Sequence, residues 1–246
     1  MYSQYDLIWL AICLVVCVAV GAILLNVMQY FKNPWVRRIP FMVITVTLFI
    51  GEIVKQCLSF NYYGAFYRIH SLPLFICSSL YIWYTMAAFF PLQSITARIG
   101  NAMAHCMSIC ITVGVLLAPK IILYSYTTRA LNGDPDFYVY HSLFFHFVIM
   151  MWAVLSIFLR AYSPDKRDIQ WIFILLAAFM VVPATATILL HHDYAGFGTQ
   201  LSFITFEWLR IVIIATIYTA VMSGLSVLVL ILLPIYIKQK LAKNKT

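Results

Sequence analysis

The amino-acid sequence predicts an all-α fold, a polytopic membrane helix bundle, and its composition carries much of that prediction. Of the 246 residues, 64% are hydrophobic and only 10% are charged, whereas charged residues make up about a quarter of an ordinary soluble domain. The mean hydropathy of +0.94 would leave a soluble domain with more exposed apolar surface than such proteins tolerate. The apolar runs also lack the alternation with a period of two that barrel strands show.

Seven apolar stretches are long enough to cross a membrane, because a helix needs roughly 20 apolar residues to span the hydrocarbon core. In chain order the predicted helices are 7–31, 39–60, 71–92, 98–118, 138–160, 169–190 and 208–233. Turn-forming residues separate several of them, at Asn33-Pro34, Pro91, Asn132-Gly133-Asp134-Pro135, Ser163-Pro164 and Gly196-Phe197-Gly198. The connections are short, so residues 1–246 are expected to form a single transmembrane domain.

The basic residues predict how the bundle is oriented, because cytoplasmic loops carry an excess of Lys and Arg. Eleven of them lie in the C-terminal tail and in the connections between helices 1–2, 3–4 and 5–6, which share one side of the membrane in this topology. Four lie on the other side. This distribution predicts an outside N-terminus and an inside C-terminus in a multi-pass protein of the cell membrane. The net charge of +8 is therefore a topology signal, and we expect no nucleic-acid partner.

The second predicted helix carries two ionisable residues, Glu52 and Lys55. A charged side chain within a span costs a few kcal/mol, roughly 2.5–3.5 on insertion scales, and so suggests a functional site. Their i, i+3 spacing places both side chains on one helix face, where they can neutralise each other. A purely structural ion pair, with the lysine reaching toward the outer interface, is the alternative interpretation. Glu52 lies near the helix centre and is expected to face the bundle interior.

A cysteine and two histidines provide the candidate nucleophile and bases. All six cysteines fall inside predicted spans, so none is expected to form an extracellular disulfide. Cys77 follows Pro73 at the start of the third span, and a buried cysteine is otherwise a small hydrophobic residue. In the fifth span His146 is the deeper histidine, whereas His141 is expected near the water interface. Five positions separate them, so they do not share one helix face. The alternative interpretation is that each histidine has a structural role only.

The start of the seventh span carries another i, i+3 pair of opposite charge, Glu207 and Arg210, which either anchors the helix or caps a cavity. His191-His192-Asp193 does not predict a metal site, because adjacent histidines on a helix point about 100° apart. We expect no metal and no cofactor. In the predicted topology six polar residues lie between mid-membrane and the outer leaflet, and their common depth predicts a polar cavity that opens outward. These residues are Glu52, Lys55, Cys77, His146, Glu207 and Arg210.

Several short motifs resemble the YwaF-like family of bacterial integral membrane proteins. They are Glu52, Leu72-Pro73-Leu74-x-x-Cys77, Gly114-x-x-x-x-Pro119 and Phe144-Phe145-His146. That family is grouped with an animal transmembrane acyltransferase that remodels phospholipids, so the resemblance implies a similar activity here. The chain departs from the pattern at Phe75, where the family usually has histidine, and at Leu74, where we expect cysteine in the animal branch.

The leading hypothesis is a membrane-embedded acyltransferase that acts on lipid. Cys77 would be the nucleophile, His146 its base and Glu52 the group that orients the base, because a free thiol with a pKa of about 8.5 needs an adjacent base at neutral pH. Membrane lipids are the expected partners, and the candidate substrate-binding residues are Lys55, His141, Glu207 and Arg210. The alternatives are a transporter, channel or sensor that uses the Glu52-Lys55 pair, or a structural partner in a membrane complex.

Overall fold

The computed structural model describes residues 4–66, 76–117, 126–133, 136–159, 162, 165–190 and 205–228. Within these ranges the chain is helical and contains no strand. Two 3₁₀ turns, η1 and η3, precede the second and third helices. The elements are α1 (Gln4–Met28), η1 (Val36–Arg38), α2 (Ile39–Tyr63), η3 (Ile76–Ser79), α3 (Leu80–Phe89), α4 (Ile95–Leu117), α6 (Tyr126–Leu131), α7 (Phe137–Phe158), α8 (Lys166–Leu190) and α9 (Glu207–Val227).

Six of the described helices, α1, α2, α4, α7, α8 and α9, are long and apolar enough to cross a membrane. They correspond to six of the seven predicted spans. The third predicted span, 71–92, differs: its described part consists of η3 and the ten-residue α3, and residues 71–75 lie outside the described ranges. Helix α3 ends where Phe90 adopts an extended conformation, as expected for a residue that precedes proline.

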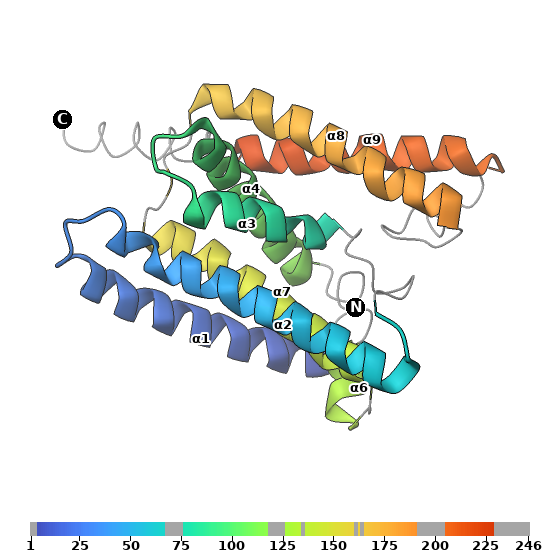
Figure 1. Ribbon diagram of the computed structural model, residues 1–246, viewed down its shortest axis with the longest axis horizontal. Coiled ribbons are helices and arrows are strands. Elements are labelled where there is room, and N and C mark those ends of the chain that lie inside the picture. The colour runs from blue at the N-terminus through green and yellow to red at the C-terminus, as the bar shows by residue number, and fades with distance from the viewer. Residues whose placement is uncertain are drawn as a thin grey trace.

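The main helices run in alternating directions (Figure 1). Because of this alternation, the starts of α2, α4 and α8 lie at the same end of the bundle as the end of α3, and polar contacts connect them. The Arg38 guanidinium donates to the carbonyls of Ala87 and Phe90 at 2.6 and 2.5 Å, so the start of α2 meets the end of α3. Arg98 near the start of α4 pairs with Asp168 near the start of α8 at 2.8 Å. The predicted orientation relative to the membrane stays a prediction, because it depends on which end faces the cytoplasm.

The most buried helix is α4, in whose most apolar stretch 72% of the residues are buried, against 22% in α1 and α9. Contacts of α4 with α3, α7, α8 and α9 make it the central helix. Large apolar side chains on α1 point outward, Ile12 and Val15 among them, as expected for helices with lipid-facing sides. The structure thus confirms a polytopic helical bundle, and its outer helices expose apolar side chains as membrane-spanning helices do.

Candidate functional site

The strongest concentration of buried charge lies on one face of α2. The carboxylate of Glu52 is 2.7 Å from the Lys55 ammonium, and the two side chains are only 13% and 10% exposed. One position further, the Gln56 amide donates to the other carboxylate oxygen at 2.7 Å. Spacings of three and four residues bring side chains onto one helix face, so the local sequence creates this arrangement directly.

Two further helices complete this group. From α3, the Tyr81 hydroxyl donates to Glu52 Oε2 at 3.1 Å. From α7, His141 Nε2 lies 3.8 Å from the same oxygen and has no hydrogen-bond partner among the described residues. The Glu52 cluster, defined as Glu52, Lys55, Gln56, Tyr81 and His141, therefore joins α2, α3 and α7 inside the bundle.

His141 thus lies closer to Glu52 than its expected place near the water interface suggested. Its side chain is only 17% exposed, and its ring lies against that of Phe145 with centroids 6.0 Å apart. The Phe145 ring also contacts Tyr81 at 5.4 Å. Aromatic packing between α3 and α7 therefore holds the imidazole beside the carboxylate.

Cys77 lies in η3, immediately before α3, as a partly buried free thiol. It packs against the main hydrophobic core. Cys77 forms no hydrogen bond to His141 or His146 in the described part of the chain. The structure therefore places the thiol at the edge of the core, four residues before Tyr81 of the cluster, without a hydrogen bond to either imidazole.

His146 is buried on α7, and its Nδ1 is 2.8 Å from the carbonyl of Ser142. A carbonyl only accepts hydrogen bonds, so the neutral ring must carry its proton on Nδ1. Nε2 then keeps its lone pair, which is the form that a general base requires. Five positions separate His146 from His141, so the two imidazoles occupy different faces of α7.

Glu207 and Arg210 do not join this group. Helix α9 packs on α8 and α4, and it lies on the opposite side of the bundle from α2 (Figure 1). Glu207 is exposed and Arg210 is half-buried, and no ion pair connects these two described residues. The Nε of Arg210 is buried without a hydrogen-bond partner in the described chain.

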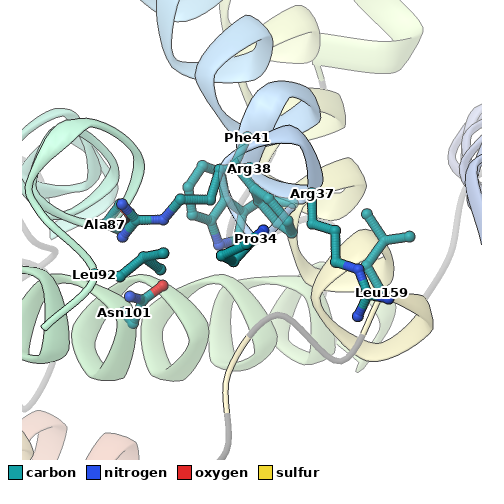
Figure 2. Close-up of a pocket in the computed structure, with 9 residues that line it drawn as sticks. Pro34, Arg37, Arg38, Phe41, Ala87, Leu92, Asn101 and Leu159 are labelled. Carbon is teal, nitrogen blue, oxygen red and sulfur yellow. Dashed lines mark hydrogen bonds between the residues drawn. The ribbon is translucent and has the colours of Figure 1, made fainter. Parts of the chain in front are cut away.

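A cavity of about 130 Å³ lies at the start of α2 (Figure 2), whereas Glu52 lies near the middle of that helix. None of the six residues for which the sequence predicts an outward-opening cavity lines it, and that outward-opening cavity stays a prediction. Among the described residues no three His, Cys, Asp or Glu side chains gather as a metal site would require, and His191-His192-Asp193 lies outside those residues.

Sequence reasoning missed Tyr81, Gln56 and the cavity. Gln56 carried a usable signal, since it follows Glu52 by four positions. Tyr81 carried none, because the sequence contains 16 tyrosines and only the packing of α3 on α2 selects this one.

A model of the TMEM164 family matches residues 1–236 of the chain. Neither the curated proteins nor the solved structures include a match. The family match covers all the described helices.

Proposed function

Because the chain belongs to the TMEM164 family and forms a multi-pass membrane bundle, we propose that it is an acyltransferase of the cell membrane that acts on phospholipid. The resemblance to the YwaF-like family implies this activity. The observation that carries the proposal is the meeting of α2, α3 and α7 around Glu52, with Cys77 four residues before Tyr81 and two imidazoles on α7.

The chemistry proceeds through a thioester. In the first step His146 Nε2 takes the thiol proton of Cys77 while the sulfur attacks an ester carbonyl of the donor lipid. The carbon–oxygen bond of that ester breaks, and the leaving hydroxyl of the lysolipid receives the proton from the imidazolium. In the second step the hydroxyl of an acceptor lysolipid attacks the thioester, its proton passes to His146, and the sulfur leaves as a thiolate that regains the proton.

Lys55 supports both steps through its charge. Its ammonium stabilises the negative charge that develops on the carbonyl oxygen of the lipid ester and of the thioester. Glu52 pairs with Lys55 at 2.7 Å and so holds its ammonium in place. Thiol and imidazole approach each other when substrate binds, since catalytic hydrogen bonds are often long in the free enzyme.

The test is acyl exchange by the full-length protein in liposomes that contain an acyl-labelled phosphatidylcholine and an unlabelled lysolipid. Cys77→Ser should abolish label transfer, and a hydroxylamine-sensitive label on the wild-type protein should disappear with it. Cys57→Ser is the matched control, because Cys57 is an exposed free cysteine on α2 and should leave transfer unchanged. Full transfer by the Cys77→Ser variant would refute the thioester mechanism.

The buried Glu52-Lys55 pair favours a second candidate function, in which the protein is an ion-coupled carrier or a sensor. Ionisable groups inside membrane proteins commonly form ion and proton pathways, and here His141 adds a third titratable group 3.8 Å from the carboxylate. The two functions differ in their response to substitution. A carrier should tolerate Cys77→Ser and lose proton-coupled uptake with Glu52→Gln, whereas the acyltransferase loses lipid turnover with Cys77→Ser.

A further inference from the structure

The cavity at the start of α2 combines basic residues with a buried hydrogen-bond donor. It has a volume of about 130 Å³ and lies where the connections between α1 and α2 and between α3 and α4 meet (Figure 2). Its lining residues come from four parts of the chain and contain no acidic side chain: Pro34, Arg37, Arg38, Phe41, Ala87, Leu92, Asn101, Trp152 and Leu159.

The two arginines of the cavity differ in burial and in hydrogen bonding. Arg38 is buried, and its two terminal nitrogens donate to the carbonyls of Phe90 and Ala87, so its charge is fixed in the cavity wall. Arg37 is exposed, and its Nε donates to the Phe31 carbonyl at 3.2 Å. No hydrogen bond or ion pair involves the two terminal nitrogens of Arg37 within the described chain. Figure 2 shows the two guanidinium groups pointing to opposite sides of Pro34.

The second observation is Trp152, a lining residue that is 1% exposed. Its indole stacks on Tyr84 with centroids 3.8 Å apart and meets the edge of Phe41 at 4.7 Å, so the ring is fixed. The indole Nε1 has no hydrogen-bond partner among the described residues. A buried donor without an acceptor is unfavourable and calls for an explanation such as an unseen ligand. A ligand oxygen in the cavity would supply the missing acceptor.

From these observations we propose that the cavity binds a phosphate group. Arg37 provides free, charged donors, Arg38 a fixed positive charge and Trp152 a buried neutral donor, and phosphate offers only oxygen atoms to them. The volume has room for roughly four water molecules at about 30 Å³ each, and thus for the oxygens of one phosphate group. The Asn101 amide donates to the Ala97 carbonyl, which leaves its oxygen to accept from a protonated phosphate.

The phosphate can belong to a lipid headgroup or to a soluble molecule, and both sources share this chemistry. Basic pockets between transmembrane helices are known to hold anionic headgroups. The proposed site shares no lining residue with the Glu52 cluster, so it does not depend on the acyl transfer proposed above.

The experiment measures thermal unfolding of the full-length protein in a neutral detergent. It is titrated with inorganic phosphate and, separately, with phosphatidic acid, and diacylglycerol with the same acyl chains is the uncharged control. A ligand that binds only the folded state raises the midpoint as its concentration increases. Arg37→Gln and Trp152→Phe each remove donors to the ligand and should weaken the apparent affinity about tenfold, the effect of losing one charge-assisted hydrogen bond.

Arg167→Gln is the matched control, since Arg167 is an exposed basic residue near the start of α8 that does not line the cavity. Stabilisation by phosphatidic acid alone would identify a lipid headgroup as the ligand, and stabilisation by both anions would identify a free phosphate group. The proposal is overturned if neither anion stabilises the protein, or if Arg167→Gln weakens the effect as much as Arg37→Gln. It is also overturned if diacylglycerol stabilises the protein as well as phosphatidic acid does.

Discussion

Glu52 and Lys55 form an ion pair of 2.7 Å within a single turn of α2, with less than one-seventh of either side chain exposed. Removing two charges from water is costly, and the cost is offset only when the charges are paired and further hydrogen-bonded. Gln56 and Tyr81 supply those extra hydrogen bonds to the carboxylate at 2.7 and 3.1 Å. Each charge in the pair therefore depends on the other.

The first prediction concerns this dependence. Glu52→Gln and Lys55→Met should each lower the free energy of unfolding by about 3–5 kcal/mol. Each substitution leaves the partner side chain buried without its counter-charge, so the partner must stay unpaired or become neutral. The double variant should recover much of that loss. The measurement is a double-mutant cycle by reversible unfolding in mixed detergent micelles.

The pair formed by Arg129 and Asp136 is the control for this cycle. Its side chains are 42% and 32% exposed at a separation of 3.2 Å, and exposed pairs couple by about 0–1 kcal/mol. Equal coupling energies in the two cycles would show that burial does not strengthen the Glu52-Lys55 interaction.

The second prediction concerns the packing of α3 on α4. A Cβ atom at Gly100 would lie 2.5 Å from Met86 Cβ and 2.6 Å from the backbone nitrogen of Ala87. Because a backbone atom cannot move aside as a flexible side chain does, Gly100→Ala should separate the helices and lower the free energy of unfolding by about 1–3 kcal/mol. Thermal unfolding in detergent measures the change.

Gly224 in α9 provides the matched control, since a Cβ there would meet no atom within 4 Å. Gly224→Ala should raise the stability by about 0.5–1 kcal/mol through helix propensity alone. If both variants were stabilised, the close approach of α3 and α4 at Gly100 would be wrong.

The all-helical membrane fold was predictable from the sequence because length and hydropathy define a span almost by themselves. The Glu52-Lys55 contact was predictable for a related reason, as both residues belong to one helix and their spacing fixes their relative direction. The spacing of five residues likewise predicted that His141 and His146 lie on different faces of one helix. These are local properties, and they do not require knowledge of which helices are neighbours.

Properties that depend on helix neighbours could not be predicted. Depth alone grouped Glu207 with Glu52, yet α9 packs on α8 and α4, because residues at one depth can lie on opposite sides of a bundle. Tyr81 and His141 reach Glu52 only through the packing of α3 and α7 on α2.

The third prediction concerns Arg38, which joins the start of α2 to the end of α3. Its guanidinium donates to two carbonyls that the helix end leaves without backbone partners, those of Ala87 and Phe90. Lysine keeps the charge but cannot reproduce this forked arrangement, so Arg38→Lys should cost about 1.5–3 kcal/mol of unfolding free energy. Arg37→Lys, at the exposed neighbouring position, should change stability by less than about 0.5 kcal/mol. Equal effects on the unfolding midpoint would contradict the assigned role of Arg38.

The fourth prediction concerns Asp168, whose side chain is 1% exposed. It accepts hydrogen bonds from Arg98 Nε at 2.8 Å, from the Asp165 backbone nitrogen at 2.9 Å and from the Tyr162 hydroxyl. The bond to Asp165 is the return half of a capping box, in which the third residue of a helix caps the backbone before it. The carboxylate therefore fixes the start of α8 and ties it to α4.

Asp168→Asn replaces one accepting oxygen with a donor, which leaves a buried partner unsatisfied, and should lower the free energy of unfolding by about 1–3 kcal/mol. Asp165→Asn is the comparison, because the Asp165 side chain is 52% exposed and its bond to Arg98 is 3.2 Å long, so its loss should be at most about 1 kcal/mol. Unfolding in detergent micelles compares the two variants, and amide hydrogen exchange over the first turn of α8 locates the effect. Faster exchange there is expected in Asp168→Asn, since the Asp168 carboxylate accepts from the Asp165 backbone nitrogen. Equal exchange in both variants would mean that the ion pairs with Arg98, and not this backbone hydrogen bond, hold the helix end.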